Sequence, residues 1–276
     1  MSVSVAFDRA RAEQRAVLVG YLPAGFPTVP GAVAAIRAMI DAGADVVEVG
    51  LPYSDPVMDG PVIQRATEAA LAGGVRIADV FRTVEAVAGA GAPVLVMTYW
   101  NPVERYGAAR STGSGGGVDR FARDLAAAGG AGLITPDLLP EEAGEWLAAS
   151  DAHRLDRVFL VAPSSSDQRV ASTVAACRGF VYAAALMGVT GARDRLSQAA
   201  PELVARVRGR GVPVGVGLGV RDGAQAAAIA GYADAVIVGS ALVSRLLSAP
   251  DEAAGRAGVR ELTAELTAGV RKPAAG

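Results

Sequence analysis

The feature that most constrains this chain is a regular alternation of short β-branched runs with longer alanine-rich stretches. The runs are continuously apolar, which is typical of parallel strands that are buried on both faces. The alanine-rich stretches have helical periodicity, so each run and the stretch after it form one strand–helix unit. The expected strands are Val17–Tyr21, Val46–Val49, Val94–Tyr99, Gly132–Thr135, Val158–Val161, Phe180–Ala184, Val214–Gly217 and Ala235–Val238.

Eight such units without a linker or a change of composition favour an α/β fold, a closed (β/α)8 (TIM) barrel. The length of 276 residues suits this architecture, so we expect residues 1–276 to form a single domain. A doubly wound open sheet is the alternative fold, and the even number of units argues against it. The clearest expected helices are Ala32–Ala42, Ile77–Ala90, Val118–Ala128 and Pro201–Arg210.

The composition excludes several classes of function. The net charge is −2, whereas a nucleic-acid or anionic-membrane partner would leave a basic footprint. One histidine and one cysteine argue against a Ser-His-Asp mechanism, an internal disulfide and a His- or Cys-rich metal centre. The longest uncharged stretch, Ala16–Ile36, contains Pro23, Pro27 and Pro30 and cannot form a continuous spanning helix. We therefore expect a cytoplasmic protein with no metal site and no nucleic-acid or membrane partner.

One segment interrupts the regular spacing of the strand–helix units. Residues 108–117 read AARSTGSGGG and lie between the third expected strand and its helix. This composition is typical of flexible linkers. We interpret the segment as a Gly/Ser-rich loop insertion on the face of the barrel where the strands end.

A carboxylate in the second expected strand is the first candidate for chemistry. Side chains alternate along a strand, so Glu48 and Val46 share one face while Val47 and Val49 share the other. A carboxylate among valines is costly unless it is paired or protonated, and burial raises its pKa toward neutrality. Such a group suits general acid–base catalysis, and a salt-bridged structural glutamate is the alternative.

The loop after this strand holds a second candidate, Asp59. The run Pro52–Pro61 contains two aspartates, three prolines and one glycine, which predicts a loop of defined shape. Asp59 could reach over the mouth of the barrel as a second carboxylate. It could equally cap a helix that begins near Pro61, and the composition does not decide between the two roles.

The late loops predict a phosphate site. Glycine turns follow the sixth, seventh and eighth expected strands, at Gly188–Gly191, Gly217–Gly219 and Gly239–Ser240. Glycine lets backbone N–H groups approach an anion closely, and a short helical stretch after Gly239 would present its N-terminus. Barrel enzymes frequently bind phosphate with the loops after strands seven and eight.

The most specific motif is the run Val47–Pro56 followed by Asp59–Gln64. It is accompanied, in order along the chain, by Tyr21–Pro27, Gly188–Gly191, Val216–Val220 and Gly239–Ala241. These segments, spread between about Phe7 and Leu247, resemble the tryptophan synthase alpha subunit family in order and spacing.

The resemblance implies a (β/α)8 barrel that cleaves indole-3-glycerol phosphate to indole and glyceraldehyde 3-phosphate, a retro-aldol reaction of tryptophan biosynthesis. It implies that this subunit itself needs no cofactor. It also implies a tryptophan synthase beta subunit as partner, which holds pyridoxal phosphate and receives indole through a tunnel. Together the two subunits would form an α2β2 heterotetramer.

The resemblance also implies a role for individual residues. Glu48 would be the catalytic general acid/base, and Asp59 would be the second catalytic carboxylate, hydrogen-bonded to the indole N–H. Thr190 would close over the substrate and organise Asp59. The implied substrate pocket is formed by Tyr21, Ile63, Tyr99, Leu160, Tyr182, Thr190 and Ile237, and the implied phosphate-binding groups are Gly191, Gly219, Gly239 and Ser240.

Two other functions remain open at this point. The chain could be a standalone indole-3-glycerol phosphate lyase that releases free indole. It could also be a weakly catalytic barrel that acts mainly as a regulatory partner. A lyase assay with and without a beta subunit separates these alternatives from an alpha subunit that its partner activates.

Overall fold

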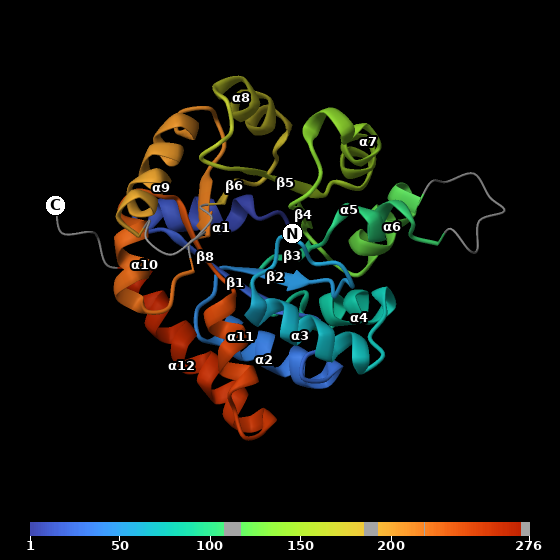
Figure 1. The fold of residues 1–276 in the computed structure, drawn as a ribbon. Coiled ribbons are helices and arrows are strands. Elements are labelled where there is room, and N and C mark those ends of the chain that lie inside the picture. The colour runs from blue at the N-terminus through green and yellow to red at the C-terminus, as the bar shows by residue number, and fades with distance from the viewer. Residues whose placement is uncertain (108–116, 185–192, 218, 272–276) are drawn as a thin grey trace.

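The computed structural model describes residues 1–107, 117–184, 193–217 and 219–271 (Figure 1). Its parallel strands pair in sequence order, and the pairing of β1 with β8 closes the barrel. The expected (β/α)8 fold is therefore confirmed, and the open sheet is wrong. The strands are β1 (Val17–Pro23), β2 (Val46–Gly50), β3 (Val94–Met97), β4 (Gly132–Thr135), β5 (Asp156–Val161), β6 (Val181–Ala184), β7 (Val214–Gly217) and β8 (Ala235–Val238).

The strand side chains alternate between the interior of the barrel and the surrounding helices. In β2, Val46 packs in the interior cluster with Leu95 of β3, whereas Val47 and Val49 pack in the cluster formed with the helices. Glu48 has the same parity as Val46 and points inward. The expected division of this strand into two faces is confirmed.

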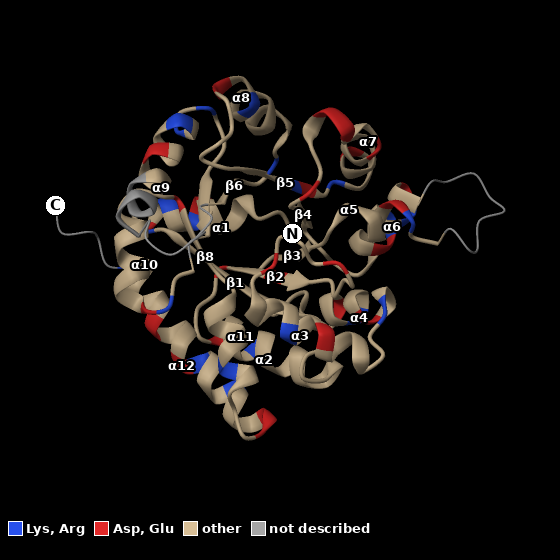
Figure 2. Ribbon diagram, in the orientation of Figure 1, with Lys and Arg blue, Asp and Glu red and all other residues tan. Residues whose placement is uncertain are grey.

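Helices form a ring around the strands, and acidic and basic residues are interspersed along the ribbon of that ring (Figures 1 and 2). In the part of the chain that the structure describes, no helix is long and apolar enough to cross a membrane. The helices are α1 (Ser4–Ala12), α2 (Val29–Asp41), α3 (Pro61–Ala72), α4 (Ile77–Val87), α5 (Trp100–Glu104), α6 (Gly117–Ala127), the 3-10 helix η2 (Pro140–Glu142), α7 (Gly144–His153), α8 (Asp167–Ala176), α9 (Arg193–Val207), α10 (Gly223–Ala230), α11 (Ser240–Leu247) and α12 (Glu252–Arg271).

Several expected boundaries are wrong by one to three residues, among them the end of β3, and the expected start of α9 is wrong by eight residues. β3 ends at Met97, because α5 begins at Trp100, whose N–H donates to the Asp137 carboxylate at 2.9 Å. α9 does not begin at Pro201 but contains it, since proline is frequent at a helix start but does not require one. Of the expected insertion, residues 108–116 lie outside the described residues and Gly117 begins α6.

The end of the barrel where the strands begin is closed by α1. Ala6, Phe7 and Ala10 of this helix belong to the interior cluster, and the rings of Phe7 and Phe180 lie 5.6 Å apart between centroids. Close by, Arg15 donates two hydrogen bonds to the Asp45 carboxylate, at 2.7 and 2.9 Å. The interior of the barrel at this end is therefore filled by α1, and the charged groups Arg15 and Asp45 are paired with each other.

Candidate active site

A cavity of about 490 Å³ lies where the strands end. Most of the residues that the sequence predicted for the site line it together, although they come from six different strand–helix units of the barrel. These residues are Tyr21, Glu48, Asp59, Ile63, Leu160, Tyr182, Gly219, Ile237, Gly239 and Ser240. Thr190 and Gly191 lie outside the described residues, so the structure does not test their predicted roles.

Glu48 is buried in the floor of this cavity. It sits on β2 between Tyr21 of β1 and Leu95 of β3, and only 1% of its surface is exposed. Its Oε1 has no hydrogen-bond partner among the described residues. Burial raises the pKa of Glu48 from 4.5 to about 8, and no neighbouring cation opposes this shift. The alternative of a salt-bridged structural glutamate does not fit these surroundings, whereas a proton donor at neutral pH does.

Asp59 lines the cavity from the loop between β2 and α3. The N-cap of α3 is Gly60, and no side chain hydrogen-bonds to this helix end, so the alternative role of Asp59 as a helix cap is wrong. Burial raises the pKa of Asp59 from 3.8 to about 6, and a hydrogen bond from the Tyr99 hydroxyl lowers it. At pH 7 this carboxyl is therefore mostly ionised, unlike that of Glu48.

Tyr99 does not line the cavity, in contrast to its predicted place in the substrate pocket. It lies behind the Asp59 loop, where its hydroxyl accepts the Met58 N–H at 2.8 Å. Its ring packs on Tyr53, with the centroids 5.3 Å apart. The amide of Gln64 donates to the Asp59 carbonyl oxygen at 2.8 Å and holds the other side of the loop. Tyr99 thus positions the second carboxylate.

Two tyrosines, Tyr21 and Tyr182, line the cavity together with Glu48. The Tyr21 ring lies against Gly50, and the Tyr182 ring lies against Gly217, so closely that a Cβ at either glycine would collide with the ring. Burial raises the pKa of both phenols well above the ordinary value, which keeps them neutral. Sequence reasoning treated Gly217 only as part of a phosphate turn and missed this packing role.

The end of the cavity that is formed by the loops after β7 and β8 has the features of an anion site. Gly219 has a φ of +65°, a left-handed conformation that glycine adopts without strain, and a Cβ there would meet open space. Gly239 is the N-cap of α11, and no side-chain hydrogen bond covers the helix start at Ser240. These free backbone N–H groups and the helix dipole favour a negative charge.

Arg221 also lines the cavity beside these glycines, and sequence reasoning missed it. The sequence signal that could have found Arg221 is its position, two residues after Gly219 in the turn that was predicted to bind phosphate. In the described part of the chain, no group of three or more His, Cys, Asp or Glu side chains could hold a metal ion.

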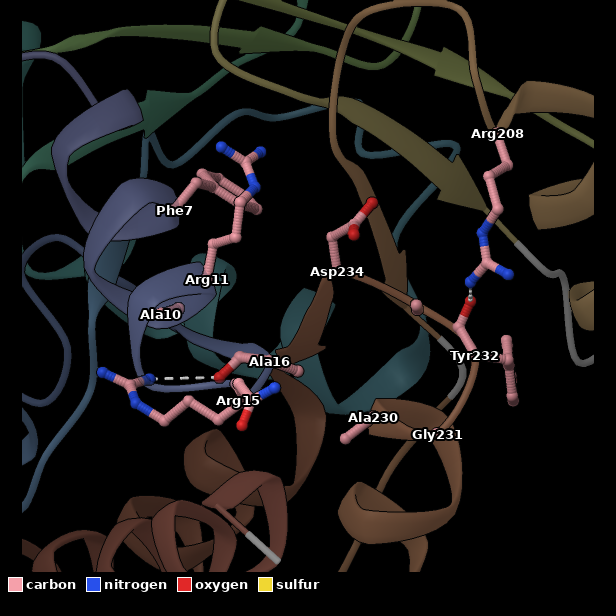
Figure 3. Close-up of a pocket in the computed structure, with 12 residues that line it drawn as sticks. Phe7, Ala10, Arg11, Arg15, Ala16, Arg208, Ala230, Gly231, Tyr232 and Asp234 are labelled. Carbon is pink, nitrogen blue, oxygen red and sulfur yellow. Dashed lines mark hydrogen bonds between the residues drawn. The ribbon is translucent and has the colours of Figure 1, made fainter. Parts of the chain in front are cut away.

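A second cavity, of about 300 Å³, lies at the opposite end of the barrel beside α1 (Figure 3). Its three basic side chains are already engaged: Arg15 pairs with Asp45, Arg11 pairs with Asp8, and Arg208 donates to the Tyr232 carbonyl oxygen at 2.7 Å. None of the predicted site residues that the structure describes lines it. The cavity at the strand ends, with its two unlike carboxyl groups, is therefore the candidate active site.

Comparison with known proteins identifies the family. A sequence model described as tryptophan synthase alpha chain matches residues 7–271. The chain belongs to this family. It is 67% identical to the tryptophan synthase alpha chain of Salinispora arenicola over 273 residues, which cover 99% of this chain and 98% of that relative.

Solved structures agree with this assignment. A chain of the tryptophan synthase of Mycobacterium tuberculosis superposes with a TM-score of 0.87 at 62% identity, over 98% of each chain. The tryptophan synthase subunit alpha of Legionella pneumophila superposes with a TM-score of 0.82 at 32% identity, again over 98% of each chain. The expected function is confirmed at the level of the family: the chain is a carbon–carbon lyase of tryptophan biosynthesis that cleaves indole-3-glycerol phosphate.

Proposed function

We propose that Glu48 and Asp59 divide the cleavage of indole-3-glycerol phosphate between them. The reaction needs a proton delivered to indole C3 and a proton removed from the C3′ hydroxyl. When the bond between C3 and C3′ breaks, its electron pair returns to the indole ring and the C3′ oxygen becomes the aldehyde carbonyl. The observation that supports this division is the difference in pKa, about 8 for Glu48 and about 6 for Asp59, within one cavity.

Each carboxyl group suits one part of the chemistry. Glu48 is protonated at neutral pH and lines the cavity, so it can donate a proton to the substrate and take one back. Asp59 is mostly ionised and can accept a hydrogen bond from the indole N–H, where positive charge develops once C3 is protonated. The apolar side chains of Ile63, Leu160 and Ile237 line the space for the ring, and Gly219, Gly239 and Ser240 would hold the phosphate.

Steady-state kinetics of three variants tests this assignment. Glu48→Gln and Asp59→Asn keep the shape of each side chain and should lower kcat at least about 100-fold, the usual scale of general acid–base catalysis. Asp55→Asn is the matched control, since Asp55 lies exposed on the same loop and does not line the cavity. Near-wild-type turnover of Glu48→Gln, with an unchanged circular dichroism spectrum, would remove Glu48 from the mechanism.

The remaining proposals concern the assembly. We propose that the chain is a single cytoplasmic domain that needs no cofactor of its own, because the reaction as written requires only proton transfers. We propose a pyridoxal-phosphate beta subunit as partner, in an α2β2 heterotetramer. The relatives named tryptophan synthase support this, as do the exposed apolar side chains of Val57, Met58 and Leu139 in the loops after β2 and β4.

Light scattering of the chain mixed with a beta subunit, combined with lyase assays, separates the candidate assemblies. A complex of two chains of each kind, with faster cleavage than by the isolated chain, is the expected result. Full turnover without any complex would instead favour the standalone lyase. Activation of the beta subunit by a chain with no lyase activity of its own would favour the regulatory partner.

A further inference from the structure

Arg221 occupies a fixed position at the phosphate end of the cavity. It follows Val220, which is 2% exposed, and precedes Asp222, the N-cap of α10. The Arg221 N–H donates to the Gln225 side-chain oxygen at 2.9 Å, and the Asp222 carboxylate accepts the Gln225 N–H at 2.8 Å. The backbone at Arg221 is thus held by the first turn of α10, while its side chain is exposed and lines the cavity.

The distribution of charge in the cavity indicates a role for the Arg221 side chain. Among the described residues that line the cavity, Arg221 alone is basic, and the other ionisable groups that carry or can carry charge there are the carboxyls of Glu48 and Asp59. A phosphate monoester that enters such a cavity is repelled by any ionised carboxylate. The neighbouring carboxylate of Asp222 is engaged in capping α10, and no ion pair joins Arg221 to another described residue.

We propose that the guanidinium group of Arg221 binds the phosphate of the substrate and selects phosphorylated over neutral indole-glycerol compounds. Backbone N–H groups at Gly219, Gly239 and Ser240 orient the phosphate by donating hydrogen bonds to it. Arg221 adds a full positive charge, which these groups lack. This inference rests on the proposed function of the same cavity. Arg221 follows β7, whereas Glu48 lies on β2, three strands away around the barrel, so we assign the contribution of Arg221 to binding and not to the chemical step.

Kinetics and inhibition of Arg221 variants test the inference. Arg221→Gln should raise KM for indole-3-glycerol phosphate and the inhibition constant of glycerol 3-phosphate by the same factor, about 3- to 10-fold, because a partly exposed charge-assisted contact is lost. The value of kcat should change less than about 2-fold, since the contact is the same in the ground and transition states. Arg221→Lys should recover part of the affinity, and added salt should narrow the difference from wild type.

Two controls keep the outcomes distinct. Arg245→Gln removes the same charge from the exposed side of α11, outside the cavity, and should leave both constants unchanged. Inhibition by indole, which has no phosphate, should not differ between wild type and Arg221→Gln. An unchanged glycerol 3-phosphate constant in Arg221→Gln, or an equal loss of indole binding, would overturn the role of Arg221. If the wild-type chain itself neither cleaves the substrate nor binds glycerol 3-phosphate, the proposed function fails instead.

Discussion

Asp45 and Glu48 are close neighbours in the sequence and have opposite surroundings. Asp45 precedes β2 at the closed end of the barrel, where its oxygens accept hydrogen bonds from Arg9, Arg15 and the Leu18 N–H. Glu48 lies on the same strand toward the open end, where its Oε1 has no partner among the described residues. The Asp45 carboxylate is therefore held by its hydrogen-bond partners. The Glu48 carboxyl is left available for a substrate, which lowers the stability of the folded protein.

This contrast predicts a pH-dependent gain in stability for Glu48→Gln. Between about pH 4.5 and about pH 8 the folded protein keeps a proton on Glu48 that the unfolded chain has lost. The free energy of unfolding of the wild type therefore falls as the pH rises through this window. A glutamine does not titrate, so Glu48→Gln should be more stable than wild type at pH 8, by about 2–5 kcal/mol.

Urea unfolding at pH 5 and pH 8 measures the effect. The difference between variant and wild type should shrink at pH 5, because this pH lies only just above the pKa of 4.5 that Glu48 has in the unfolded chain, so little of the pH-dependent loss has yet occurred. Glu85→Gln on α4 is the control, because Glu85 is exposed and its replacement should make the same small difference at both pH values. A difference for Glu48→Gln that does not change with pH would contradict the burial of a protonated carboxyl.

At the scale of elements, the pairing of Asp45 with Arg15 joins the segment after α1 to the beginnings of β1 and β2. Arg15 is 4% exposed and Asp45 is 3% exposed. Asp45→Ala would leave a buried guanidinium without its main partner and should lower the free energy of unfolding by about 3 kcal/mol. Asp8→Ala breaks the exposed pair with Arg11, at 3.2 Å, and should cost less than about 1 kcal/mol.

Denaturant titration gives both values, and lyase kinetics completes the experiment. Because the pair lies at the end of the barrel opposite the cavity, Asp45→Ala should retain the wild-type kcat wherever it is folded. A loss of activity in a variant of unchanged stability would show that the two ends are coupled.

At the scale of the whole molecule, the cavity gathers loops from strands that are far apart in sequence. An anion bound at Gly219, Gly239 and Ser240 therefore stabilises the loops after β7 and β8 together. Glycerol 3-phosphate at about 100 times its dissociation constant should add about 2.7 kcal/mol to the free energy of unfolding. Thermal unfolding monitored by circular dichroism should show a higher midpoint with glycerol 3-phosphate and no shift with glycerol. Equal midpoints would show that the folded chain does not bind glycerol 3-phosphate and would contradict the predicted phosphate site.

Much of this molecule was predictable from the sequence because strands and their faces follow a simple rule. The period-two pattern around Glu48 fixed its inward direction, and the order of the glycine turns indicated the phosphate end. The side chains of loops follow no such period, so the place of Tyr99 behind the Asp59 loop required the structure. The same holds for Arg221, whose direction depends on how α10 begins.

The contact between Gly217 and the Tyr182 ring limits which amino-acid substitutions can change the shape of the cavity. The two positions share one volume, so a side chain added at 217 must displace the ring into the cavity. A smaller residue at 182 would make room for that side chain. The two positions are therefore expected to change as a pair, and a library that varies them together should recover cavities of new shape that neither single change can reach.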